Sequence, residues 1–233
     1  MKTSDRHDSI IFYVFLAAGA CLSIVISLTD FLSETDTTNL KYFGIILCAC
    51  FAAYSTLCGK KYAITVLCAL IFTLISDYFL LVKDDNYELG VCSFIVAQSL
   101  YFARIYLEKK KFPTVSLSIR LLVFTVGIVI IYVSGLAEFL TIAAVLYACM
   151  LTGNVIESYT DIKLGVYRIL FAVGLTLFAC CDICVMLYNL NSFIDVSISQ
   201  KTLNTIVNSA WVFYLPSQIL ISLSSMPIKN SQA

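Results

Sequence analysis

Charged residues are scarce in this chain. Asp, Glu, Lys and Arg make up only 13% of its 233 residues, and the mean hydropathy is +0.92. A typical soluble domain carries about 25% charged residues, so the composition excludes an ordinary soluble fold. The formal net charge is zero, and therefore neither a nucleic acid nor an acidic substrate is indicated as a partner.

Proline, glycine and histidine are also rare, with three, nine and one residues. Few breaker residues argue against disorder and favour long helices. The ten cysteines lie almost entirely in apolar segments, which is unlike a disulfide scaffold, and we expect free thiols that pack as small apolar groups. The cluster of Cys180, Cys181 and Cys184 has no histidine nearby, and a helix would spread these side chains around its axis. We expect no metal and no organic cofactor.

Long apolar runs are what the chain does contain. A membrane span needs about 20 mainly apolar residues. The first run is too long for the apolar part of an ordinary signal peptide and is expected to be a span. The breaks between runs are short and polar, so we expect an all-α, polytopic membrane protein, 1–233 forming a single transmembrane bundle. The eight expected spans are about 10–28, 40–58, 62–82, 89–107, 116–134, 137–156, 166–188 and 203–223.

The distribution of Lys and Arg predicts the orientation of these spans. Eight spans place both termini and every second connection on one side of the membrane, and twelve of the 15 basic residues fall on that side. Only Lys41, Lys83 and Lys201 fall on the opposite side. Cytoplasmic segments carry the excess of positive charge. Both termini are therefore expected to be cytoplasmic.

Two aspartates interrupt apolar runs. Asp77 lies in the run 70–82, and Asp182 lies in the run 175–187. Under the predicted topology both spans run outward, and each carboxyl group lies roughly 23 Å along its helix, in the outer half of the bilayer. An ionisable residue inside a membrane span is costly enough to suggest a function.

A short similarity links the fourth and eighth spans. The segments FIVAQSL, from Phe94 to Leu100, and YLPSQIL, from Tyr214 to Leu220, share an aromatic residue, a glutamine and a leucine at the same spacing. Together with the two aspartate-bearing spans, this pattern is compatible with a parallel internal repeat of four spans. Alternatively, the Gln and Asn side chains simply form hydrogen bonds between helices.

The aspartates leave more than one function open. Two nearby carboxylates in a low-dielectric site cannot both ionise easily, which yields a proton donor beside a base, as in glycosidases. The same pair could relay protons in a proton-coupled membrane transporter. A structural or lipid-sensing bundle would leave the matched depth of the two aspartates unexplained.

At this point the chain resembles the YhhN-like lysoplasmalogenase family of eight-span membrane proteins. Ser76-Asp77-x-x-Leu80-Leu81 is similar to the family's Gly/Ser-Asp-x-x-Leu-Leu motif. Three further segments carry the resemblance: Gly90-x3-Phe94-x3-Gln98-x2-Tyr101, Gly174-x3-Phe178 with Cys181-Asp182, and Trp211 to Gln218. The similarity covers nearly the whole chain. Cys181 stands where the family has Ser, Gln98 where some members have His, and Tyr188 where the family has Asn.

The resemblance implies hydrolysis of the sn-1 vinyl ether of a lysoplasmalogen, a lysophospholipid, to a fatty aldehyde and a glycerophospho-alcohol. It implies Asp77 and Asp182 as catalytic acid and base in either order. Gln98, Tyr101, Tyr214 and Gln218 are expected to position water and the glycerol end of the substrate. The expected partners are this substrate and membrane lipid; the oligomeric state and the headgroup preference stay open.

Overall fold

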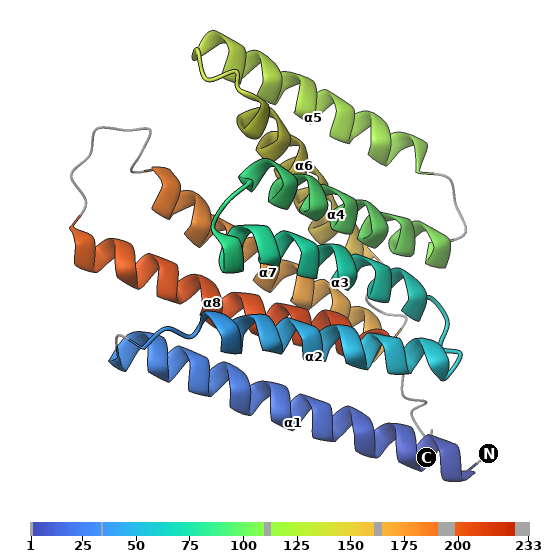
Figure 1. The fold of residues 1–233 in the computed structure, drawn as a ribbon. Coiled ribbons are helices and arrows are strands. Elements are labelled where there is room, and N and C mark those ends of the chain that lie inside the picture. The colour runs from blue at the N-terminus through green and yellow to red at the C-terminus, as the bar shows by residue number, and fades with distance from the viewer. Residues whose placement is uncertain (1, 34, 110–112, 161–164, 191–198, 227–233) are drawn as a thin grey trace.

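A computed structural model of the chain describes residues 2–33, 35–109, 113–160, 165–190 and 199–226 (Figure 1). The described part consists of helices joined by short connections. Each of the eight α-helices belongs to a stretch long and apolar enough to cross a membrane. These helices are α1 (Lys2–Leu32), α2 (Thr38–Leu57), α3 (Ala63–Asp77), α4 (Tyr87–Lys109), α5 (Thr114–Val133), α6 (Phe139–Ser158), α7 (Val166–Leu190) and α8 (Gln200–Leu223).

The eight predicted spans are confirmed, with ends that mostly differ by one to three residues. The largest difference is at the N-terminus, where α1 begins at Lys2 and not near residue 10. The helix α1 therefore begins in the polar N-terminal segment, about eight residues before the apolar run from which the span was predicted. Asp8 explains part of this extension, because its buried carboxylate forms an ion pair with Lys60 in the connection between α2 and α3.

The helices lie side by side with α8 near the centre of the bundle (Figure 1). Helix α8 packs against α7, α1, α2 and α3, whereas α4 packs against α3 and α6. Helix α5 lies at the edge, packs on α6, and buries only Arg120 and Ile131. Its other large side chains, such as Leu121 and Val129, are exposed on the outside of the bundle, as expected for a helix that faces lipid.

Two glycines bring helices into close contact near the aspartates. A Cβ atom at Gly174 on α7 would lie 3.0 Å from the carbonyl oxygen of Ser217 on α8, so only glycine permits this approach of the two backbones. On α4, the carbonyl oxygen of Gly90 accepts a 2.7 Å hydrogen bond from the Ser76 hydroxyl on α3. A Cβ atom at Gly90 would lie 2.5 Å from the Leu80 side chain.

The third span is not a single α-helix. Asp77 ends α3, and the next six residues form the π-helix η1 (Tyr78–Lys83). π-helical segments are rare and often accompany functional sites. The apolar periodicity of the run 70–82 does not distinguish an α-helix from a π-helix, since the change shows only in the backbone hydrogen bonds.

We name the two ends of the bundle by a residue found there. The Asp30 end holds the last residues of α1, η1, α5 and α7 and the first residues of α2, α4, α6 and α8. The Arg104 end holds the opposite ends of these helices. The positive-inside count would place the Asp30 end on the outer side of the membrane.

Candidate functional site

Asp77 lies at the end of α3 with only 5% of its surface exposed. The hydroxyl group of Tyr214, on α8, lies 2.7 Å from each of the two carboxylate oxygens and donates to them. The predicted catalytic residue Asp77 and the predicted substrate-binding residue Tyr214 therefore form a direct contact. The contact also fixes the position of α8 against α3.

Asp182 has a partner of the same kind, in the middle of α7. The Tyr147 hydroxyl, on α6, donates a 2.5 Å hydrogen bond to its Oδ2 atom. Tyr147 was not among the predicted site residues. The sequence places Tyr147 within a span at about the depth expected for Asp182, which made it a possible partner. It did not show that α6 and α7 pack together at that depth.

A row of aromatic rings connects the two aspartate–tyrosine pairs. The ring centroids of Tyr147 and Phe94 are 5.7 Å apart, those of Phe94 and Phe178 are 5.6 Å apart, and those of Phe178 and Tyr214 are 5.5 Å apart. Edge-to-face and tilted contacts of this length are favourable. The two carboxyl groups are thus linked through a row of four packed rings from α4, α6, α7 and α8.

Cys181, the residue before Asp182 on α7, is also buried. No Lys or Arg nitrogen of the described residues lies within 4.0 Å of either carboxylate. Tyrosine hydroxyl groups, not cations, are thus the polar partners of both acids.

Buried polar groups form a layer one helical turn from the Asp77–Tyr214 contact, toward the Arg104 end. Thr73 lies one turn before Asp77 on α3, Gln218 one turn after Tyr214 on α8, and Gln98 and Tyr101 follow Phe94 on α4. All four residues have 0% exposure. The Thr73 and Tyr101 hydroxyls lie close to each other, and among the described residues none bonds Gln98 Nε2 or Gln218 Oε1.

Gln98, Tyr101 and Gln218, three of the residues expected to position water and substrate, all lie in this buried layer. An unpaired buried polar group costs about 1–3 kcal/mol, so the two amide atoms in this layer are compatible with hydrogen-bonding ligands or water.

Asn154, in the last turns of α6, is a residue that the sequence did not single out. It is fully buried, and its Nδ2 atom donates to the carbonyl oxygen and Oε1 of Gln98 at 2.8 and 2.9 Å. Its Oδ1 atom accepts a 3.1 Å hydrogen bond from Arg120, which also forms an ion pair with Glu157 at 3.0 Å. Asn154 therefore fixes the orientation of the Gln98 amide.

Lys41 is a second residue whose position only the structure reveals. From the sequence it counted as one of the few basic residues on the outer side. In the structure it lies inside α2, with 11% of its side chain exposed, and its Nζ atom is 2.8 Å from Asp30 Oδ2. The ammonium group also lies over the Trp211 ring, 4.9 Å from the centroid.

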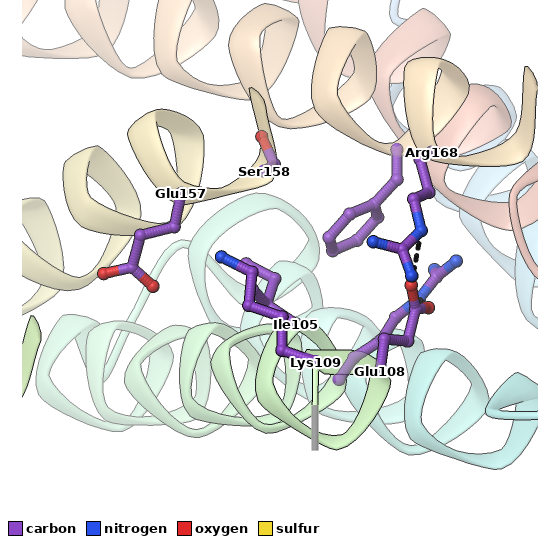
Figure 2. Close-up of a pocket in the computed structure, with 8 residues that line it drawn as sticks. Ile105, Glu108, Lys109, Glu157, Ser158 and Arg168 are labelled. Carbon is purple, nitrogen blue, oxygen red and sulfur yellow. Dashed lines mark hydrogen bonds and ion pairs between the residues drawn. The ribbon is translucent and has the colours of Figure 1, made fainter. Parts of the chain in front are cut away.

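The pocket shown in Figure 2 lies at the Arg104 end, away from the aspartates. It encloses about 20 Å³, room for one water molecule. Glu108 forms 3.2 Å ion pairs with both Arg104 and Arg168, and Arg104 also donates to the hydroxyl and carbonyl oxygens of Ser224. These charges are paired with one another, so this pocket shows the features of a structural cluster.

An apolar groove of about 380 Å³ lies between α1, α2 and α8. Gly19, Gly44 and Leu215 are among its lining residues. Leu215 points into this groove while the hydroxyl of the adjacent Tyr214 bonds Asp77, so α8 separates the groove from the carboxyl groups.

All ten cysteines are free thiols, as expected. Only Cys48 and Cys181 are buried, however, and Cys21, Cys50 and Cys58 are exposed. The expectation that the thiols pack inside the protein is therefore wrong for most of them. Membrane helices can present small apolar groups outward, because the surrounding lipid is apolar too.

A comparison with protein-family models gives one match, the YhhN family, over residues 8–225. No curated protein and no solved structure matches the chain. The matched range includes both aspartates, their tyrosine partners, the polar layer and Lys41. The chain belongs to the YhhN family.

Proposed function

We propose that this protein is a membrane hydrolase that cleaves the sn-1 vinyl-ether bond of lysoplasmalogens. The products are a fatty aldehyde and a glycerophospho-alcohol. The observation that supports this proposal most directly is the pair of carboxyl groups, Asp77 and Asp182, each bonded to a tyrosine at one end of the same row of aromatic rings. A membrane site suits an amphiphilic substrate that is already dissolved in lipid.

The chemistry requires one acid and one base. The acid transfers a proton to the β-carbon of the vinyl ether, which leaves an oxocarbenium ion at the carbon attached to oxygen. Water adds to that carbon while the base accepts its proton. The resulting hemiacetal breaks its bond to the glycerol oxygen, which takes a proton, and the aldehyde is released. No metal or organic cofactor enters these steps.

The surrounding residues support particular roles in this scheme. The Tyr214 and Tyr147 hydroxyls orient the carboxyl groups of Asp77 and Asp182. A negative carboxylate stabilises the nearby oxocarbenium ion. The polar layer offers Gln98, Tyr101 and Gln218 as groups that hold the attacking water or the glycerol hydroxyl, and Asn154 orients the first of these.

The test is aldehyde release from a lysoplasmenyl lipid by the purified protein in mixed detergent micelles. We expect Asp77→Asn and Asp182→Asn to lower kcat by about 100-fold or more, the usual range for a general acid or base. Asp85→Asn is the matched control, since Asp85 is an exposed aspartate near the same end. In D2O, aldehyde trapped at once by reduction should carry deuterium at carbon 2.

Two results would contradict the proposal. One is an absence of aldehyde release by the folded wild-type protein. The other is undiminished release by both Asp→Asn variants. Proton flux into proteoliposomes that depends on the same aspartates, without aldehyde release, would favour the transporter instead.

A further inference from the structure

Near the carboxyl sites, the structure contains a buried ion pair that the proposed reaction does not use. Asp30, near the end of α1, and Lys41, in the first turns of α2, approach to 2.8 Å. Their side chains are 5% and 11% exposed. An ion pair removed from water in this way is a weak source of stability, because the cost of desolvating the charges offsets their attraction.

The hydrogen bonds of this pair are incomplete. Asp30 Oδ1 accepts a 2.5 Å hydrogen bond from Thr37, but the buried Oδ2 atom accepts no aligned hydrogen bond from a described residue. The Lys41 ammonium group has three N–H donors. Its contacts with described residues are the ion pair with Asp30 and the face of the Trp211 ring, which leaves donors available for an anion.

A chain of contacts joins this ion pair to the candidate catalytic centre. The Trp211 ring that faces Lys41 meets the Tyr214 ring edge-on, with centroids 5.1 Å apart. Tyr214 in turn bonds Asp77. Trp211 precedes Tyr214 by three residues on α8, about 4.5 Å nearer the Asp30 end along the helix. Two contacts, of 4.9 and 5.1 Å, thus join Lys41 Nζ to the Tyr214 ring.

This spacing fits a lysophospholipid. In such a lipid six bonds separate the vinyl-ether carbon from the phosphorus atom, roughly 7 Å at about 1.5 Å per bond, allowing for bond angles. With the vinyl ether at Asp77, a phosphate roughly 7 Å away falls within the reach of the two contacts that join Tyr214 to Lys41. Arg104 and Arg120 lie on the opposite side of Asp77, toward the Arg104 end, and each is already paired with a glutamate, Glu108 and Glu157.

We propose that Lys41 binds the phosphate group of the substrate, and that Asp30 holds the lysine in place. This inference rests on the proposed function and adds to it the phosphate as a recognised group. Lys41 and Asp30 carry one positive and one negative charge, as a zwitterionic headgroup does. Lys41 would face the phosphate, and Asp30 would face the ammonium end of an ethanolamine or choline group.

The test compares two substrates with the same alkenyl chain, a lysoplasmenyl phospholipid and the 1-alkenylglycerol that lacks the phosphate. Both are presented at the same mole fraction in nonionic micelles. We expect wild-type kcat/KM to be at least about tenfold higher for the phospholipid, as is usual for charge-assisted recognition. Lys41→Met should raise KM for the phospholipid by about tenfold, leave its kcat within about twofold, and leave KM for the alkenylglycerol unchanged.

Three further variants separate recognition from folding. Lys41→Arg should retain the preference for the phospholipid, because it keeps the charge. The double variant Lys41→Met with Asp30→Asn removes both charges together, so no unpaired carboxylate remains, and it should show the same KM increase as Lys41→Met. Lys201→Met is the matched control, since Lys201 is an exposed lysine at the start of α8.

The outcomes are distinguishable. Equal wild-type efficiency on the two substrates would overturn the role of Lys41, even if no Lys41 variant folds. Equal losses on both substrates in Lys41→Met would show a structural role only and would also overturn it. If the wild-type protein releases aldehyde from neither lipid, the proposed function itself fails.

Discussion

The Tyr214 hydroxyl lies 2.7 Å from both carboxylate oxygens of Asp77, although 137 residues separate the two in the chain. Asp182 has the same kind of partner in Tyr147. Both carboxyl groups therefore have a neutral hydroxyl donor where a soluble protein would often supply a cation. Such a donor can orient an acid without holding it permanently in the ionised form, as an acid that must give up a proton requires.

Removal of either tyrosine hydroxyl should impair catalysis more than substrate binding. We expect Tyr214→Phe and Tyr147→Phe each to lower kcat by about 10-fold to 100-fold, because the carboxyl group loses its orienting hydrogen bond. KM should change by less than about threefold. Steady-state aldehyde release measures both quantities, with Tyr132→Phe as the control because Tyr132 is exposed on α5. A wild-type kcat in both site variants would show that the hydroxyls do not orient the acids.

Truncation of Asn154 should destabilise the protein and disorder the Gln98 amide. In Asn154→Ala, Gln98 loses its donor and Arg120 loses one acceptor, and each unpaired buried group costs about 1–3 kcal/mol. Thermal unfolding in detergent should therefore show a clear decrease in Tm, accompanied by lower activity. Asn204→Ala, at an exposed position of α8, should leave both unchanged. An unaltered Tm in Asn154→Ala would contradict the structural role of this network.

The two close glycines should differ in their tolerance of alanine. At Gly174 the new Cβ would meet backbone atoms of Ser217 and Ile221 at 3.0 and 3.1 Å, which cannot move without separating α7 from α8. We expect Gly174→Ala to destabilise the protein by about 1–3 kcal/mol. At Gly90 the nearest atoms belong to the Leu80 side chain, which can change rotamer, and the loss should be smaller. Thermal unfolding compares the pair; a larger loss at Gly90 would contradict this packing argument.

The predicted orientation can be tested with a membrane-impermeant maleimide. Cys58, exposed at the Arg104 end, should be labelled only after the membrane is permeabilised, because the basic residues concentrate at that end. A cysteine introduced by Thr35→Cys, in the exposed α1–α2 connection, should be labelled in intact cells. Lipid should protect the thiols on the helix surfaces within the bilayer. Labelling of Cys58 but not of the introduced cysteine in intact cells would reverse the topology.

The sequence alone was sufficient to predict the eight spans, because apolar runs of about 20 residues have few alternatives to a membrane helix. It also identified the two aspartates, since a carboxyl group inside an apolar run is conspicuous whatever the fold. Asp77 and Tyr214 both carried the family resemblance, but their direct contact was not predicted.

Which residues meet was decided only by the tertiary structure. Tyr147, Asn154 and Lys41 occur in unremarkable sequence contexts, and their roles depend on the packing of α6 on α4 and α7 and on the position of Trp211 beside α2. The π-helix after Asp77 was likewise invisible in the apolar pattern. The free energy of transfer into lipid depends on the residues of each span alone, so the spans can be predicted from local sequence. Hydrogen bonds and ring contacts between spans depend instead on how helices distant in sequence pack together.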